Sequence, residues 1–261
     1  MLEGGGDLKR EAGREQSRAD QAPLVTPLQH FYRTSSLPCP YLANRVERKL
    51  VTELAPRDGE ALYNDLSRAG FRRSHHLAYR PACAGCASCV PVRIDVHAFA
   101  PSRSQRRVLA ANADLAGTEA SPVATPEQYR LFFRYQRSRH AQSDMAAMTF
   151  GDYRTMIEDS PVDTALIELR DGGGRGRLVG GCLVDRLDDG YSAVYSFFDP
   201  ALAERSLGTF AVLWLVEAAR RRGAPYVYLG YWIGSSPKMS YKTRFQPLEA
   251  LGPDGWRRVD L

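Results

Sequence analysis

The chain has little histidine, few cysteines and no long apolar run. No hydrophobic stretch approaches the ~20 residues that a helix needs to span a bilayer, and residues 1–20 lack the apolar segment of a signal peptide. We therefore expect a cytoplasmic protein without a membrane partner, in which the five cysteines are thiols or metal ligands rather than disulfides. The sequence also has neither a Gly-x-Ser-x-Gly elbow nor a P-loop, which argues against a serine hydrolase and an NTPase.

The composition is that of a globular protein with an excess of positive charge. At 261 residues, with 44% hydrophobic and 25% charged residues, the chain can bury a sizeable core. The net charge of +5, from 35 Lys and Arg against 30 Asp and Glu, favours an acidic partner such as RNA. Residues 1–27 are rich in Gly, Gln and charge and are predicted to form a disordered tail. Two domains, 28–115 and 116–261, are expected to follow, because Ala, Gly, Thr and Pro accumulate between them.

One stretch predicts a β-α-β unit. Residues 191–198 and 226–231 are dense in aromatic and β-branched residues, and 207–222 carries apolar residues at helical spacing. Two strands joined by a helix run parallel, so the fold class is expected to be α/β. The start of this helix places bare backbone N–H groups at the carboxyl end of the first strand, where they suit a carbonyl oxygen or a phosphate. The alternative is an ordinary β-α-β core with Ser206 as a helix cap.

The rest of the folded chain shows shorter patterns. Strands are expected at 45–54, 71–80, 90–96, 163–170 and 178–187, and helices at 60–69, 102–115, 126–141 and 151–159. The strands at 163–170 and 178–187 are predicted to form a hairpin. Thr125 is the expected N-cap of the third helix, with Pro126 at its first position.

Four of the five cysteines lie in the first half of the chain. Cys83, Cys86 and Cys89 form two consecutive Cys-x-x-Cys steps, and Cys39 can supply a fourth ligand from a distance. Four thiolates suit tetrahedral zinc or an iron–sulfur cluster, and the spacing does not distinguish the two. The alternative is a group of reduced structural thiols. Cys182 stands alone in an apolar strand, where a small buried side chain is expected.

Cations gather in three places. The segment 102–107 mixes arginines with hydroxyl and amide donors, which suits phosphate oxygens. Arg130, Arg134 and Arg137 share one face of the third helix, although a solvated charged face explains them as well. More cations follow the second core strand. The candidate contacts to RNA are Arg103, Arg106, Arg107, Arg134, Arg137, Ser206, Gly208, Lys242 and Arg244.

Polar residues also follow the two parallel strands, where ligands of open α/β sheets bind. Acyl transfer between two bound substrates needs a positioned amine, a base or water, and donors for the oxyanion. Asp199 is suited to orient or deprotonate an ammonium group. Tyrosine hydroxyls, Lys238 and the amides near Gly208 are suited to the oxyanion. The candidate catalytic residues are Tyr195, Ser196, Asp199, Tyr231, Lys238 and Tyr241.

Several phrases together resemble one family. They are FYRTSSLPCPYLANRVERKL, LSRAGFRRSHHLAYRPACAGCASCVPVRI, FAPSRSQRRVLAANADL, YSFFDP, RSLGTF and YVYLGYWIGSSPKMSYKTRFQPLE. They are similar to the bacterial aminoacyl-tRNA–protein transferases, short relatives of eukaryotic arginyl-tRNA–protein transferase, whose bacterial branch comprises the aspartate/glutamate leucyltransferases. The similarity spans about residues 30–249. It leaves out the N-terminal tail and the Gly-rich hairpin turn.

The resemblance implies both a fold and a reaction. A Cys-rich N-terminal region should precede a GNAT-like acyltransferase domain. Leucine should move from leucyl-tRNA to the α-amine of proteins that begin with Asp or Glu, marking them for degradation through the N-degron pathway. Transfer should require no cofactor, because the tRNA ester is already activated. In the eukaryotic relatives the cysteine region is associated with an iron–sulfur cluster.

Three alternatives remain at this point. Arginine is the first, as a different donor for the same chemistry, and the pocket for the aminoacyl side chain would decide it. The aromatic residues Phe197, Phe198, Tyr231 and Trp232 favour an apolar pocket for leucine. A coenzyme A dependent N-acetyltransferase is the second, although the glycine-rich pyrophosphate pattern of such enzymes is missing around 205–208. A zinc-dependent RNA-binding module is the third. DNA is not an expected partner.

Overall fold

The computed structural model describes residues 29–55 and 57–259, so the predicted tail at 1–27 lies outside the described residues. The large sheet contains β7 (Val90–Asp95), β8 (Ala116–Ala120), β9 (Thr164–Arg170), β10 (Leu178–Leu187), β11 (Gly190–Phe198), β12 (Tyr226–Trp232), β13 (Leu248–Gly252) and β14 (Gly255–Val259). The small sheet contains β1 (Tyr32–Arg33), β4 (Lys49–Glu53), β5 (Arg72–Ser74) and β6 (Leu77–Pro81), and a ribbon pairs β2 (Leu37–Pro38) with β3 (Val46–Glu47). The α-helices are α1 (Gly59–Arg68), α2 (Arg103–Ala111), α3 (Pro126–Arg139), α4 (Phe150–Glu158) and α5 (Leu207–Arg221). The 3₁₀ segments are η1 (Asp144–Ala147), η2 (Gly172–Gly174), η3 (Pro200–Arg205) and η4 (Pro237–Arg244).

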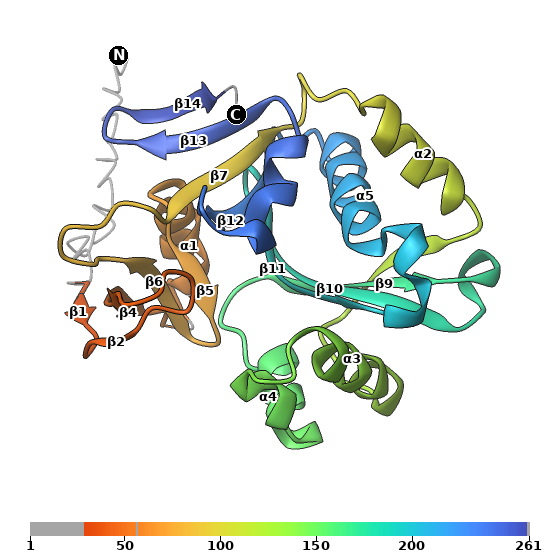
Figure 1. Ribbon diagram of the computed structural model, residues 1–261, viewed down its shortest axis with the longest axis horizontal. Helices are drawn as coiled ribbons and strands as arrows, with labels where there is room; N and C mark the ends of the chain where they lie inside the picture. Colours follow the sequence, from red (N-terminus) through yellow and green to blue (C-terminus); the bar gives the residue numbers. More distant parts are fainter. Residues whose placement is uncertain (1–28, 56, 260–261) are drawn as a thin grey trace, which may run out of the picture.

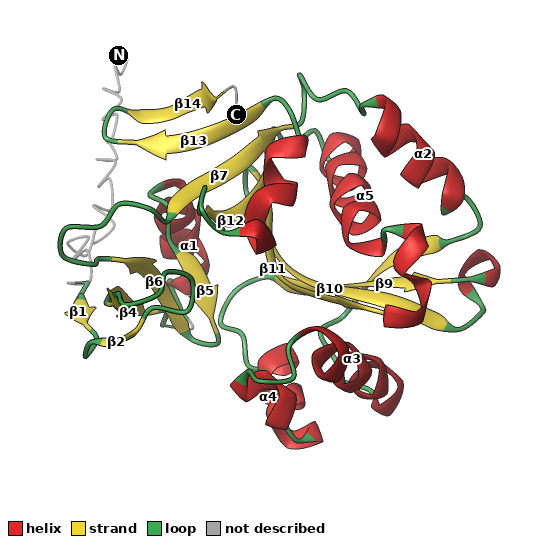
Figure 2. Cartoon of the chain, in the orientation of Figure 1, coloured by secondary structure: helices red, strands yellow, loops and turns green. Residues whose placement is uncertain are grey.

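The large sheet has helices on both faces. Its strand order is β14-β13-β7-β12-β11-β10-β9-β8, with α5 and α2 covering one face and α3 and α4 the other (Figures 1 and 2). Alternation along β9 shows the division, because Ala165 and Ile167 pack with α5 while Leu166 between them packs with α3 and α4. The predicted α/β class is therefore confirmed.

The central β-α-β prediction is also confirmed. Strands β11 and β12 are parallel, and α5 connects them. The helix α3 begins as predicted, since the Thr125 hydroxyl accepts a hydrogen bond from the Gln128 amide and Pro126 occupies the first position. The predicted hairpin of β9 and β10 is antiparallel.

Other local predictions were wrong in part. The expected strand at 71–80 is a hairpin of β5 and β6, whose turn holds His75 in a left-handed conformation with φ 53°. The expected helix at 102–115 ends at Ala111, because the Asn112 side chain donates to the carbonyls of Val108 and Arg205, and the chain then enters β8. Ser206 has φ 53° and its side chain makes no cap, so the alternative in which Ser206 caps the helix is not observed.

The N-terminal and C-terminal regions share the large sheet. Strand β7 lies between β12 and β13, so the predicted boundary at 115 divides strands of one sheet. The small sheet is joined to it by a buried ion pair, in which Arg73 on β5 binds Asp185 on β10 with Nη2 and Oδ1 2.7 Å apart. The Thr164 hydroxyl donates to the same carboxylate. A buried pair of this kind fixes how the two sheets dock, because either charge alone would be costly to bury.

Candidate functional site

The two parallel strands of the core separate part-way along their length. Strands β11 and β12 pair only from Gly190↔Tyr226 to Ser192↔Tyr228, and β12 shifts register against β7 between Tyr228 and Gly230. The carbonyls beyond this point of β11, those of Ala193 and Val194, accept hydrogen bonds from Arg72 instead, at 2.7 and 2.9 Å from Nη2. The guanidinium of Arg72 thus enters the gap between the strands.

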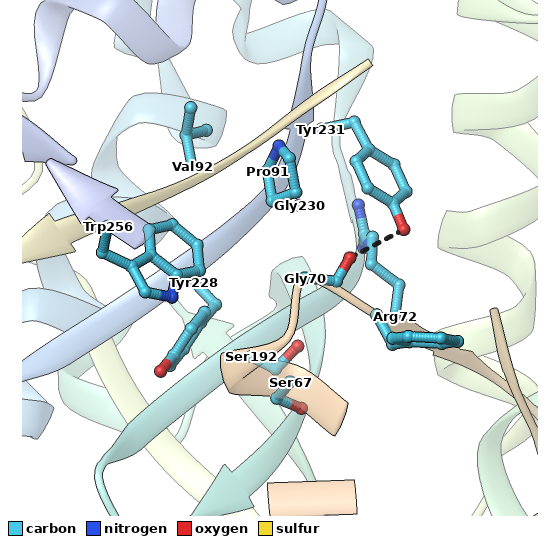
Figure 3. Close-up of a pocket in the computed structure, with 11 residues that line it drawn as sticks. Ser67, Gly70, Arg72, Pro91, Val92, Ser192, Tyr228, Gly230, Tyr231 and Trp256 are labelled. Atoms are coloured by element: carbon cyan, nitrogen blue, oxygen red, sulfur yellow. Dashed lines mark hydrogen bonds between the residues drawn. The ribbon is translucent and has the colours of Figure 1, made fainter. Parts of the chain in front are cut away.

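Gly230 makes room for this arginine. Its φ is +74°, and an added Cβ would lie 1.8 Å from Arg72 Nη1. A bulge with glycine at this place therefore allows the side chain of β5 to approach the backbone of β12. The cavity behind the arginine is about 10 Å³, room for about one water molecule, and is lined by residues that include Ser192, Tyr228 and Trp256 (Figure 3).

A second cation lies close to Arg72. Lys242 in η4 is only 4% exposed, and its Nζ donates to the Tyr231 carbonyl. Burial and the nearby Arg72 lower the pKa of Lys242 from 10.5 to about 7. A side chain buried in this way does not present itself to a tRNA phosphate, so the predicted phosphate contact at Lys242 is corrected.

Two of the predicted catalytic tyrosines lie beside this pair of cations. Tyr231 is buried, and its hydroxyl lies 3.0 Å from the carbonyls of Gly70 and Tyr79, so it holds the small sheet against β12. Tyr241 is 39% exposed and lies within electrostatic reach of Arg72. Tyr195, in contrast, accepts a hydrogen bond from Gln136 on α3, and burial raises its pKa. The structure therefore places Tyr231 and Tyr241 within reach of Arg72 and turns Tyr195 towards α3.

The carboxylate of Asp199 is already engaged. Its side chain is 1% exposed, accepts from the Ala201 amide at the start of η3, and forms ion pairs with Arg177 at 2.9 Å and Arg134 at 3.6 Å. To act as a base it would have to leave these partners. In the structure it anchors the turn after β11. Arg134, a predicted tRNA contact, keeps a side chain that is 52% exposed.

The other predicted catalytic residues lie apart from each other. Ser196 is paired with Cys182 across β10 and β11, on the face that packs against α5. Lys238 is exposed in η4. Burial lowers the pKa of His140, and the nearby charge of Lys238 lowers it further.

The predicted tRNA contacts occupy two faces of the sheet. Arg103, Arg106 and Arg107 are exposed on α2, whereas Arg134 and Arg137 are exposed on α3 across the sheet (Figure 1). A hydrogen bond of 2.9 Å from Gln105 Nε2 to the carbonyl of Arg244 ties α2 to η4, so the exposed Arg244 lies on the side of α2. Ser206 is exposed at the start of α5, and Gly208 lies against the ring of Phe198. The cations of α2 and η4 therefore form one candidate surface and those of α3 another.

The four cysteines converge without forming a coordination shell. Burial and the thiols of Cys39, Cys83 and Cys86 raise the pKa of Cys89 to about 11. The Cys83 sulfur accepts a hydrogen bond from the Arg48 amide at 3.4 Å. Within residues 29–55 and 57–259, no three His, Cys, Asp or Glu side chains are arranged to hold a metal ion. The cysteine loop nevertheless lies near β12, because Cys89 is among the groups that influence the buried hydroxyl of Tyr231.

Sequence reasoning missed Arg72, Arg73 and the burial of Lys242. The two arginines follow the apolar Phe71 and lie in the first strand of the β5–β6 hairpin. Two adjacent charges in a strand were the signal that could have drawn attention to them. Gly230 inside the aromatic run 226–232 was a sign of a bulge or of a close backbone approach. Neither sign identifies the partner, since Arg72 and Gly230 are far apart in the chain.

Comparisons with known proteins cover most of the chain. Residues 37–107 match the family described as "Arginine-tRNA-protein transferase, N terminus", and residues 127–252 match its "C terminus". A protein of Paramagnetospirillum magneticum named aspartate/glutamate leucyltransferase is 59% identical over 92% of this chain and 97% of its own length. One of Rhodospirillum rubrum with the same name is 52% identical over 92% of this chain and 97% of its own length.

Among solved structures, FemX matches over 74% of this chain and 65% of its own length, with 8% identity and a TM-score of 0.45. A tandem GNAT protein from the clavulanic acid biosynthesis pathway matches over 82% of this chain and 78% of its own length, with 13% identity and a TM-score of 0.39. In the part of the chain that the structure describes, no helix has the length and apolar character needed to cross a membrane.

The burial of Lys242 predicts a pH-dependent stability. Between pH 7 and about 10.5 the unfolded chain binds a proton at this lysine that the folded chain does not, so this group makes stability rise with pH across that window. Lys242→Met removes the effect. We expect the variant to gain free energy of unfolding relative to the parent at pH 6, and to gain less at pH 9.5, in urea titrations at both pH values. Lys49→Met, at a surface lysine paired with Glu47, serves as control. An equal difference at both pH values would show that Lys242 is charged throughout.

Proposed function

Because the chain belongs to the arginine-tRNA-protein transferase family, we propose that it transfers leucine from leucyl-tRNA to the α-amine of proteins that begin with Asp or Glu. Membership of this family makes it an aminoacyltransferase that uses tRNA and protein as substrates. The observation that carries the choice of leucine is the 59% identity to a named aspartate/glutamate leucyltransferase over 97% of that protein. The family's own description names arginine, which keeps arginine as the second candidate donor.

The reaction needs little beyond positioning. The neutral α-amine of the acceptor attacks the ester carbonyl of the aminoacyl-tRNA, a C–N bond forms, and the bond to the tRNA ribose oxygen breaks. The amine loses one proton and the ribose hydroxyl gains one, so neither ATP nor coenzyme A is consumed. Holding the amine against the ester accounts for much of the rate in reactions of this kind. Amide donors at the start of α5, beside Gly208, are suited to the oxyanion.

The donor is expected to approach on the side of α2. Arg103, Arg106 and Arg107 are exposed there, and α2 is tied through Gln105 to η4, which carries Arg244. Exposed arginines beside hydroxyl and amide groups suit tRNA phosphates. Arg134 and Arg137 on α3 belong to the opposite face (Figure 1), so the two groups of arginines form separate candidate surfaces.

The four cysteines fit a metal or an iron–sulfur cluster by their chemistry. Cys39, Cys83, Cys86 and Cys89 are the residues that would hold it. The influence of the other three on the Cys89 thiol shows that all four cysteines lie in one region of the fold. Gly85, with φ +64°, provides the turn between two of them. A bound metal or cluster would cross-link the cysteine loop, and transfer would proceed without it as a reactant.

The donor and the acceptor can be identified in one assay. Purified protein is given radiolabelled leucyl-tRNA and arginyl-tRNA in parallel, with peptides that start with Asp, Glu, Lys or Ala as acceptors. Label from leucine is expected on the Asp and Glu peptides alone. Label from arginine on the same peptides would keep the mechanism and change the donor, and no label from either donor would overturn the proposed function.

The surface on α2 is tested by salt dependence. Replacing Arg106 and Arg107 with Ala removes two proposed phosphate contacts, so tRNA affinity should fall and the negative slope of log K against log salt should become shallower by about 1.5. A matched control replaces Arg257 and Arg258, two exposed arginines on β14, and changes the net charge equally. Filter binding from 50 to 300 mM salt gives both slopes. If both variants keep the parent's slope, the tRNA surface lies elsewhere.

The cysteine proposal is tested by metal content. Cys83→Ser removes one of four ligands, so the purified variant should lose bound zinc or iron and unfold at a lower temperature. Cys182→Ala, at a buried thiol distant from the loop in sequence, should keep the parent's metal content. Elemental analysis and thermal unfolding measure both effects. Equal metal content in the parent and Cys83→Ser would indicate that the four cysteines are structural thiols and do not bind a metal.

A further inference from the structure

Arg72, which is half-buried, and Lys242, which is buried, differ from the buried arginines Arg73 and Arg93. Arg73 is paired with Asp185 at 2.7 Å, and Arg93 with Glu249 at 2.7 Å. For Arg72 and Lys242, the described part of the chain provides no carboxylate at ion-pair distance. Burying a charge without a partner is costly, and two like charges side by side raise the cost further.

The surroundings of the two cations are polar but uncharged. Tyr63 on α1, Tyr79 on β6, Tyr231 on β12 and Tyr241 on η4 lie within electrostatic reach of Arg72. Cys182 on β10 and Tyr41, between β2 and β3, are also within electrostatic reach of the same arginine. These groups are phenols and a thiol, so none provides the arginine with a carboxylate partner.

Both cations retain unused hydrogen-bond donors. The bonds of Arg72 to the Ala193 and Val194 carbonyls use Nη2, and Lys242 uses one proton on the Tyr231 carbonyl. The remaining donors of Arg72 and two protons of Lys242 have no acceptor in the described residues. Arg72 also keeps part of its surface accessible, whereas Lys242 is 4% exposed. An anion would therefore reach Arg72 first, with Lys242 as a second positive charge behind it.

We propose that Arg72 and Lys242 form the recognition site for the side-chain carboxylate of the acceptor's N-terminal Asp or Glu. This inference rests on the proposed function. A single carboxylate at the end of an extended peptide needs only the space beside one guanidinium, and Arg72 keeps part of its surface accessible where β11 separates from β12. The phosphates of a tRNA belong to a bulky backbone, and the aminoacyl end has its nearest phosphate on the far side of the terminal nucleoside. The acceptor is therefore the substrate that fits.

The site explains selectivity for an acidic N-terminus by charge. A neutral residue of the same shape would leave both cations uncompensated, and a basic residue would add a third positive charge. Binding of the carboxylate also favours the protonated form of Lys242. The affinity for an acidic acceptor should therefore fall as the pH rises above 7, the value to which burial and Arg72 lower the pKa of this lysine in the free protein.

The test compares peptides that start with Asp and with Asn, which differ only in charge. Affinities are measured by fluorescence anisotropy for the parent, Lys242→Gln, Lys242→Arg and Arg221→Gln. Glutamine can still donate to the Tyr231 carbonyl but carries no charge, and arginine restores the charge. Arg221 lies at the far end of α5, with a side chain 57% exposed, and controls for loss of one positive charge. Thermal unfolding checks that each variant is folded.

The parent should prefer the Asp peptide by about tenfold or more, and the preference should shrink between pH 6 and pH 8.5. Lys242→Gln should lose most of the preference by weakening the Asp peptide alone, and its remaining preference should not depend on pH. Lys242→Arg and Arg221→Gln should retain the preference. An unchanged ratio of Asp to Asn affinity in Lys242→Gln would overturn the site, and so would a parent that does not distinguish the two peptides.

Binding and transfer separate this inference from the proposed function. A parent that transfers leucine to Asp peptides while Lys242→Gln keeps the full Asp preference would refute the site and leave the transferase assignment intact. Conversely, a parent that transfers no amino acid but binds Asp peptides through Lys242 would refute the proposed function and leave the carboxylate site standing.

Discussion

The separation of β11 from β12 is the constraint on which the functional region depends. After three paired positions, from Gly190 to Ser192, the two parallel strands part and backbone carbonyls lose their neighbours. Carbonyls that are buried must find other donors, and Arg72 supplies them from β5. The small sheet is thus part of the site rather than a separate module, and the adjacent Arg73–Asp185 pair fixes its position. Gly230 completes the arrangement by leaving the space that a side chain would fill.

Features set by neighbouring residues were predictable from the sequence. Thr125 and Pro126 specify the start of α3 through capping chemistry, and the alternation and turn residues around β9 and β10 specify a hairpin. Features set by distant residues were not. Strand β7 takes its place between β12 and β13 because of pairings with residues more than 130 positions away, and α2 stops where Asn112 meets the Arg205 carbonyl.

The same distinction applies to the candidate site. The sequence placed polar residues at or just beyond the ends of the parallel strands, and in the structure Tyr231 in β12 and Tyr241 in η4 lie within electrostatic reach of Arg72. From the sequence, every basic residue of the loop after the second parallel strand was assigned to the surface. Lys242 turns inward, whereas Lys238 and Arg244 in the same segment stay exposed. One helical segment therefore carries cations with two different environments, and only packing against β12 decides which residue is buried. Asp199 is the converse case, because its partners Arg177 and Arg134 come from other elements.

These two environments suit two different substrates. Exposed arginines on α2 attract a polyanion weakly and reversibly, because water and salt screen each contact. A buried, uncompensated pair acts over a short range in a medium of low dielectric, so it distinguishes one small anion from its neutral isostere. A transferase that accepts many proteins but only acidic N-termini needs the second kind of contact for the acceptor. It needs the first kind for a tRNA that must leave after each transfer. The loss of strand pairing beyond Ser192 brings Arg72 to the place where the two strands separate, and there the second kind of contact can exist.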